Sequence, residues 1–174
     1  MSASMSRGGR SRVGNWHWTL YVVLALAGAL LTFAGARAQQ KASDDAKFRT
    51  LIDDLCAAWS TGNAVAPAKF YAKDPGLVFY DMGPRSYHSW KEYQDGVQKE
   101  LKENPEDFTL TAGKDLKVSR RGMIAWTTVS MHLTEGPRNG NTTETNLRYT
   151  GIWEKRGASW VLVHDHLSAP VPGN

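Results

Sequence analysis

The chain has 174 residues, with 21 basic and 17 acidic side chains and one cysteine. The surplus of four basic residues lies entirely before residue 39: Arg7, Arg10, Arg12 and Arg37. Residues 39–174 are therefore neutral, which removes the electrostatic argument for binding nucleic acid or an acidic membrane surface. The lone cysteine, Cys56, excludes an intrachain disulfide, so this domain depends on packing for its stability.

The N-terminal segment has the pattern of an export signal. Its basic start is followed by an uncharged, mostly apolar run from Thr19 to Ala36, and Ala36-Arg37-Ala38 has the small-x-small form of a signal-peptidase site. We predict that residues 1–38 are a secretory signal peptide and that residues 39–174 form one periplasmic or secreted domain. The alternative is an uncleaved membrane anchor, because the uncharged run approaches the length that spans a bilayer.

The domain is predicted to begin with helices. Six apolar residues follow the spacing of one helix face: Phe48, Leu51, Ile52, Leu55, Cys56 and Trp59. Ser43 suits the start of this helix and Gly62 its end. A short helix is expected over residues 65–71. A third is expected over residues 90–102, preceded by the capping residue Ser89.

One strand is predicted before the third helix, over residues 77–81, and a loop over residues 82–88 separates the two. Three more strands are predicted after that helix, over residues 108–112, 116–119 and 123–135. The last of these has two distinct faces. One face carries Ile124, Trp126, Thr128, Ser130 and His132. The other carries Met123, Ala125, Thr127, Val129, Met131 and Leu133.

A hairpin closes the chain, with strands on either side of a turn at residues 156–159. Simple alternation puts four residues of its second strand on one face: Trp160, Leu162, His164 and His166. A symmetric turn predicts that Trp153 pairs with Leu162, Gly151 with His164, and Tyr149 with His166. Two imidazoles beside a glycine gap, ringed by aromatic residues, indicate a concave and partly polar pocket.

The hairpin also carries a family resemblance. From Arg148 to Pro170 it reads Arg-x-Thr-x-apolar-Trp, a short turn, Trp, and then His-x-His-x-Ser-x-Pro. This resembles the closing hairpin of the SnoaL-like branch of the nuclear transport factor 2-like superfamily, and the association domain of calcium/calmodulin-dependent protein kinase II has a similar ending. The resemblance implies an α+β fold for residues 39–174: a cone-shaped, curved antiparallel sheet wrapped around N-terminal helices, with a cavity between them.

Asp81 is the first candidate catalytic residue. It matches the general base of the ketosteroid isomerases that this superfamily includes, and a carboxylate at the mouth of an apolar pocket can accept a proton. The alternative is a structural role at a strand end. The isomerase tyrosine would fall near Leu55, where the sequence has none, and the isomerase strand acid has no clear counterpart. The sequence therefore argues against steroid isomerisation.

His164 and His166 have three interpretations. They are general acid/base residues of the pocket, a metal pair completed by His132 or Asp81, or structural groups bonded to backbone or to Arg148. No Cys or Glu cluster accompanies them, so we predict neither a metal nor a cofactor.

Further ligand contacts are expected from the aromatic and polar residues of the sheet: Trp126, His132, Arg148, Tyr149 and Trp153. A planar apolar or aromatic molecule suits such a lining. Arg148 either binds an anionic ligand or holds a carboxylate of a second subunit.

Two functions follow. In the first, an exported SnoaL-like domain binds a small, largely apolar molecule and uses Asp81 with His164 or His166 for isomerase, cyclase or dehydratase chemistry. In the second, a non-catalytic module forms a homodimer or higher homo-oligomer through the outer face of its sheet. The apolar face of residues 123–133 is then either that surface or part of the core.

Overall fold

The computed structural model describes residues 16–82, 86–103, 107–136 and 141–170. The chain divides into two compact units, residues 1–41 and 42–174. The first contains the beginning of helix α1 (Trp16–Trp59), and the basic residues of the predicted signal lie outside the described ranges. Within those ranges, no helix combines the length and apolar character that crossing a membrane requires. Cleavage after Ala38 stays a prediction.

In the second unit, α1 carries the predicted apolar stripe into the core. Phe48, Ile52 and Leu55 are at most 1% exposed. The predicted helix start at Ser43 is wrong, because α1 is continuous from Trp16. No proline interrupts this alanine-rich sequence, so nothing forces a break there. Gly62 follows the helix with a φ of 66°, a conformation that glycine adopts without steric cost.

Two further helices follow as predicted. A 3-10 helix, η1, covers Ala66–Phe70, and α2 covers Trp90–Glu103. At the start of α2, the Ser89 hydroxyl accepts a hydrogen bond from the Glu92 N–H at 3.1 Å. The Glu92 carboxylate in turn accepts one from the His88 N–H at 2.8 Å. The first of these bonds satisfies an N–H group that a helix start leaves unpaired, and the second ties the residue before the cap to the first turn of α2.

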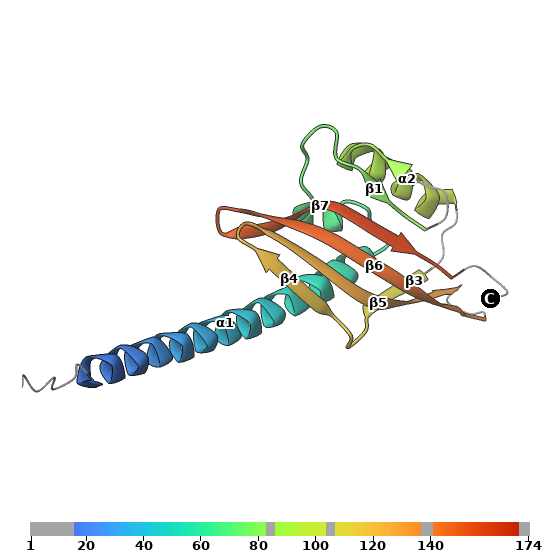
Figure 1. Ribbon diagram of the computed structural model, residues 1–174. Helices are drawn as coiled ribbons and strands as arrows, with labels where there is room; N and C mark the ends of the chain where they lie inside the picture. The colour runs from blue at the N-terminus through green and yellow to red at the C-terminus, as the bar shows by residue number, and fades with distance from the viewer. Residues whose placement is uncertain (1–15, 83–85, 104–106, 137–140, 171–174) are drawn as a thin grey trace, which may run out of the picture. The chain divides into compact units, whose positions relative to one another are not determined.

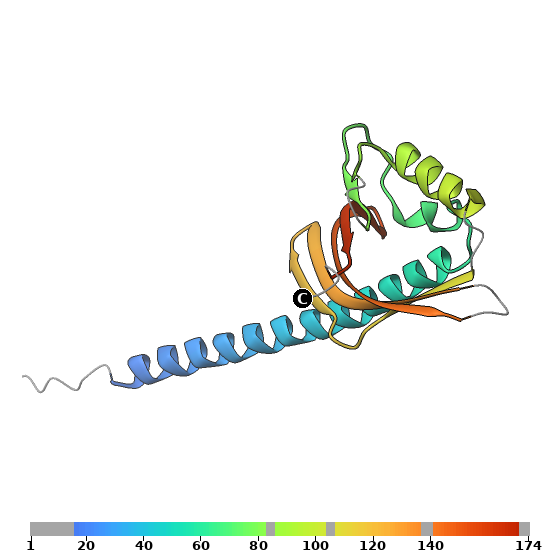
Figure 2. The ribbon, with the colours of Figure 1, turned by 90° about the vertical axis from the view of Figure 1, so that its right-hand side faces the viewer.

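The strands form a curved sheet, seen from two sides in Figures 1 and 2. Its order is β2-β1-β7-β6-β5-β3, with β4 also pairing β5. The strands are β1 (Phe79–Tyr80), β2 (Ser86–Tyr87), β3 (Asp107–Ala112), β4 (Lys117–Arg121), β5 (Ile124–Gly136), β6 (Thr143–Arg156) and β7 (Ser159–Ser168).

The α+β fold is confirmed, with one correction to the sheet. β1 pairs β7 in parallel, so the sheet is mixed and not wholly antiparallel. β1 joins the sheet beside the last strand of the chain, and that long-range pairing has no local sequence signal. β2 lies in the segment predicted as a loop, because two residues are too few to carry a period.

The two faces of β5 are distinct, as predicted. We call the face with Ala125, Thr127, Val129, Met131 and Leu133 the inner face, and the opposite face the outer face. These five residues are at most 5% exposed, whereas Trp126 on the outer face is 37% exposed. The apolar face of β5 is therefore core, apart from the exposed Met123 before the strand.

The register of the closing hairpin contains a β-bulge. Trp153 pairs with Leu162 as predicted, but Ile152 pairs with His164, so Val163 is an extra residue on β7. Such an insertion shifts every later residue of the strand to the opposite face.

The bulge overturns two predicted pairs. Gly151 lies opposite Asp165 instead of His164, and Tyr149 lies opposite Leu167 instead of His166. Asp165 and Leu167 therefore reach the inner face. The two histidines, which alternation assigned to the pocket side, lie on the outer face.

Candidate functional site

An internal cavity of about 170 Å³ lies among α1, α2 and the inner face of the sheet. A single water molecule needs only about 10–15 Å³ of such free space, so the cavity has room for a larger molecule. Most of its wall is apolar, including Leu55, Met131 and Leu147. Several lining residues are half-buried, among them Asp81, Phe108 and Glu135, so the cavity reaches towards solvent on that side.

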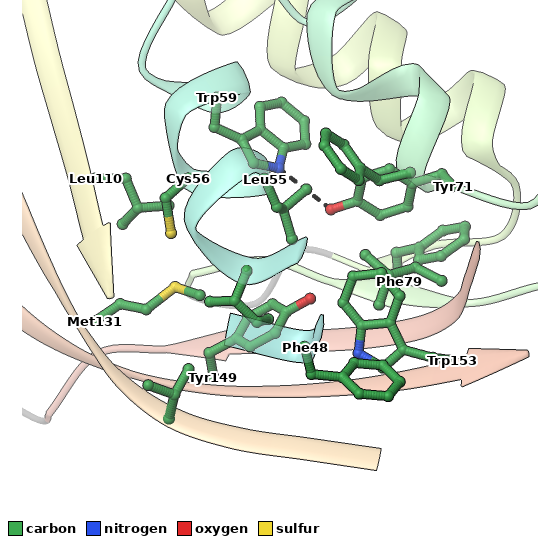
Figure 3. Packing of buried hydrophobic residues seen from close by; sticks show 14 of the residues in the cluster. Phe48, Leu55, Cys56, Trp59, Tyr71, Phe79, Leu110, Met131, Tyr149 and Trp153 are labelled. Atoms are coloured by element: carbon green, nitrogen blue, oxygen red, sulfur yellow. Dashed lines mark hydrogen bonds between the residues drawn. The ribbon is translucent and has the colours of Figure 1, made fainter. Parts of the chain in front are cut away.

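A chain of hydrogen bonds runs along one wall of the cavity. The Trp59 indole N–H donates to the Tyr71 hydroxyl at 3.2 Å, drawn as a dashed line in Figure 3. The Tyr71 hydroxyl donates to Asp165 Oδ2 at 2.7 Å. These residues come from α1, from the segment after η1 and from β7. An isolated parallel β-bridge joins the backbone of Tyr71 to that of Leu162 in β7, and it positions the Tyr71 ring near Asp165.

Asp165 is the most unusual group in this wall. Asp165 is only 2% exposed, and its Oδ1 atom has no hydrogen-bond partner. The pKa of Asp165 is raised to about 7, first by burial and to a smaller extent by Asp81, while the hydrogen bond from Tyr71 acts in the opposite direction. A carboxyl group with such a pKa is present in both protonation states near neutral pH, as a proton donor or acceptor requires.

Tyr149 supplies a second unsatisfied group. This residue is 5% exposed, and its hydroxyl has no partner. Burial raises its pKa well above the ordinary value, so the phenol is neutral at physiological pH. Gly151 makes room for this hydroxyl, because a Cβ there would lie 2.9 Å from Tyr149 Oη. The predicted glycine gap exists, but a tyrosine hydroxyl fills it instead of imidazoles.

Asp81 lines the same cavity, immediately after β1. The parallel pairing of β1 with β7 sets Phe79 opposite Asp165, which brings the two carboxyl groups to one wall. Asp81 Oδ1 also accepts a hydrogen bond from the Met82 N–H at 2.7 Å. The residue is thus both a cavity group and a strand-end cap, and both interpretations of it remain open.

His164 and His166 lie away from the cavity. The His164 Nδ1–H donates to the Val78 carbonyl at 2.7 Å, and both imidazoles pack edge-on against the Tyr80 ring. Neither lines the cavity. The geometry of His164 agrees with the structural interpretation, because a carbonyl can only accept a hydrogen bond.

The other predicted contacts divide between the two faces. Trp126, His132 and Arg148 are on the outer face, and Arg148 borders a shallow depression there with Asp115 and Lys117. His132 Nδ1 lies 3.1 Å from Asn146 Oδ1. The expectation that Trp126 and His132 line the pocket is therefore wrong.

Trp153 is on the inner face but fully buried. It donates a hydrogen bond from its indole N–H to Thr127 Oγ1 at 3.0 Å and packs edge-on against Phe48, so it belongs to the core. Of the five predicted ligand contacts, Tyr149 alone lines the cavity. Across the described ranges, no group of three or more His, Cys, Asp or Glu side chains has the arrangement of a metal site.

Asp165, Tyr71 and Tyr93 line the cavity but are not among the site residues predicted from the sequence. Tyr93 lies on the buried side of α2, and its ring stacks against Phe79. Asp165 was assigned to the other face because the bulge was not foreseen. One signal was available: an acidic residue inside an apolar strand, flanked by two histidines, is unusual whichever face it takes.

Comparison with known proteins agrees with this architecture. The model of the SnoaL-like domain matches residues 49–172. A nuclear transport factor 2-like superfamily protein from Salmonella enterica serovar Typhimurium is 18% identical, with a TM-score of 0.66 over 76% of this chain and 95% of its own. No match was found among curated proteins.

Two further solved structures share the fold. A candidate calcium/calmodulin-dependent protein kinase II association domain from Xanthomonas campestris is 23% identical, with a TM-score of 0.61 over 74% of this chain and 88% of its own. A candidate dehydratase of the NTF2-like family from Streptomyces avermitilis is 14% identical, with a TM-score of 0.60 over 74% of this chain and 95% of its own. With the family model covering most of the second unit, the chain belongs to the SnoaL-like domain family, within the nuclear transport factor 2-like fold.

Proposed function

We propose that this protein binds a small, largely apolar molecule in the cavity and transfers protons to or from it with Asp165 and Asp81. One observation carries the proposal: Asp165 Oδ1 is buried without a partner in a wall of an otherwise apolar cavity. A buried polar atom without a partner costs about 1–3 kcal/mol. A bound molecule that offers a hydrogen bond at that position removes this cost.

The chemistry proposed is of the isomerase, cyclase or dehydratase type. Such reactions need one group that gives a proton and another that takes one. Asp165, with its pKa of about 7, serves as the donor when protonated, and Asp81 serves as the acceptor. The neutral phenol of Tyr149 adds a hydrogen-bond donor for a developing oxyanion. The outer-face histidines have no part in this proposal.

The test is native mass spectrometry of the protein isolated from the cells that make it, without refolding. We expect a small molecule at one copy per subunit, lost or depleted in Asp165→Ala. The matched control is Asp95→Ala, which removes an exposed carboxylate of α2 that pairs with Lys91. An empty cavity in the unmodified protein at every extraction condition would contradict the proposal.

We also propose that the protein works outside the cytoplasm, on the strength of the basic, apolar and small-x-small pattern before Gln39. Cell fractionation with N-terminal sequencing tests this. A mature chain that starts at Gln39 in the periplasmic or culture fraction is expected. A chain that retains its N-terminus and sediments with membranes would favour the anchor instead.

Self-association is a second candidate function, favoured by exposed apolar side chains on the outer face. Ile124 is 40% exposed and Trp126 is 37% exposed. The Met123-to-Leu133 face named from the sequence is largely buried, so any sheet-mediated contact uses the outer face instead. Light scattering at micromolar concentration should give a dimer or larger species that Trp126→Glu dissociates, while Val65→Glu, at another exposed apolar position, has no effect. A monomer would rule this function out.

A further inference from the structure

We infer that His164 is a positioning residue: its hydrogen bond to the Val78 carbonyl holds β1 against β7, so that Asp81 lies in the same cavity wall as Asp165. The inference rests on the proposed function for the use of Asp81 in proton transfer. It gives His164 no contact with the ligand, since His164 is not among the residues that line the cavity.

The strand that precedes Asp81 has little backbone pairing. β1 is two residues long, and its register with β7 sets Phe79 opposite Asp165 and Tyr80 opposite His166. The pairing on its other side, with β2, is equally short. Strands usually have about 3–10 residues, so β1 depends on side-chain contacts to keep its place. Asp81 directly follows β1, so a movement of β1 also moves this carboxyl group.

On the inner face, Phe79 anchors β1 to the core. Phe79 is fully buried, and its ring packs against Tyr71 and Tyr93. Apolar packing is not directional, so it holds β1 to the core without fixing the position of the residues that follow.

The outer face supplies a directional contact. His164 Nδ1 donates a hydrogen bond to the Val78 carbonyl oxygen at 2.7 Å. Val78 immediately precedes β1 and Asp81 immediately follows it, so this bond fixes one end of the strand while Asp81 lies at the other. The Tyr80 ring packs edge-on against the same imidazole, with ring centroids 5.6 Å apart, which adds a second contact on this side.

The bulge in β7 makes this arrangement possible. Because Val163 is an extra residue, His164 lies on the outer face and Asp165 on the inner face. One short stretch of β7 therefore provides a cavity carboxyl group and, from its opposite side, the contact that holds the strand carrying the second one.

The pKa of Asp165 depends on where Asp81 lies. Asp81 contributes to the raised pKa of Asp165, although burial contributes more. The interaction between two charges weakens as their separation grows, so a displaced Asp81 would lower the pKa of Asp165. A hydrogen bond that served stability alone would leave this pKa unchanged when it was removed.

The test is an NMR titration of Asp165 in the full chain, labelled with 13C at its aspartate carboxyl groups, with Asp165→Asn to identify the resonance. His164→Phe keeps a ring against Tyr80 but has no donor for Val78. It should lower the pKa of Asp165 in the same direction as Asp81→Asn does, and by no more. His164→Asn, whose amide N–H lies close to the position of Nδ1, should retain the pKa of the unmodified protein.

Three comparisons exclude other causes. Loss of a positive imidazole would raise the pKa of Asp165, because a nearby cation favours the ionised carboxyl group, so a fall cannot come from that loss. In the Asp81→Asn protein, adding His164→Phe should not change the pKa of Asp165, since no charge remains to be displaced. His132→Phe removes another outer-face imidazole, one beside Asn146, and should have no effect.

Three results would overturn the inference: an unchanged pKa of Asp165 in His164→Phe, a fall that persists when Asp81→Asn is also present, or an equal fall in His164→Asn. If His164→Phe does not fold, His164→Gln takes its place, because its amide donor lies nearer the position of Nε2 than that of Nδ1.

These titrations need no ligand, so they separate the inference from the proposed function. An empty cavity in mass spectrometry would end the proposed function and leave the positioning of Asp81 by His164 intact. An unchanged pKa of Asp165 in His164→Phe would end the inference and leave the proposed proton transfer open to its own test.

Discussion

Replacement of Asp165 by asparagine should change the pH dependence of stability in a defined direction. The amide keeps the shape of the carboxyl group and can still accept the 2.7 Å hydrogen bond from Tyr71. It cannot ionise. The unmodified protein and the variant should therefore differ in stability only at pH values where the Asp165 carboxyl of the unfolded chain is ionised.

The size of the effect follows from the shift in the Asp165 pKa from 3.8 to about 7, which is caused first by burial. Between these pH values the folded state holds a proton that the unfolded state has lost. The free energy of unfolding therefore falls as pH rises through this window, and the loss is complete above pH 7. The full shift corresponds to about 4 kcal/mol.

Urea unfolding followed by tryptophan fluorescence, at intervals from pH 4 to pH 8, measures this difference. Asp165→Asn should have nearly the stability of the unmodified protein at pH 4 and exceed it by roughly 4 kcal/mol at pH 8. Asp95→Asn, an exposed control, should show no such trend because its carboxylate lies in solvent beside Lys91. A difference between Asp165→Asn and the unmodified protein that is flat with pH would refute our account of the site.

Three other variants test neighbouring parts of the argument. Tyr71→Phe removes the hydroxyl that favours ionised Asp165, so its cost of about 1–3 kcal/mol should be larger at pH 8 than at pH 5 in the same unfolding assay. Gly151→Ala places a Cβ 2.9 Å from Tyr149 Oη and should cost about 1–3 kcal/mol of stability by overpacking. Adding Tyr149→Phe should recover part of this loss. If the stability changes of the two single variants simply add in the double variant, the contact is not present. Ser89→Ala removes the N-cap of α2 and should lower thermal stability by about 1 kcal/mol in calorimetry without altering ligand binding.

Much of the fold was predictable because its elements have strong local signals. The apolar stripe of α1, the capping residue of α2 and the alternation along β5 depend only on neighbouring residues, and each was confirmed. The family resemblance of the closing hairpin was confirmed by the family model. The start of α1 was missed because no helix-breaking residue marks a boundary near Ser43. The strand β2 was missed because its two residues are too few to show an alternating pattern.

The candidate site was predictable only in part. Asp81 and Tyr149 were named from the sequence and line the cavity. Trp126 was placed there because the sequence shows which residues share a face of β5, but not which face meets the helices. Asp165 was assigned away from the cavity and the histidines towards it, since strict alternation was assumed along β7.

The sequence by itself determined the order of the helices and the longer strands, the two faces of β5, and the superfamily. The tertiary structure decided which groups enter the cavity. Its deciding feature is the bulge at Val163, where one extra residue in β7 exchanges the faces of His164 and Asp165. Because side chains alternate with a period of two, a single inserted residue reverses every later assignment, and only the pairing of β7 with β6 shows where it occurs.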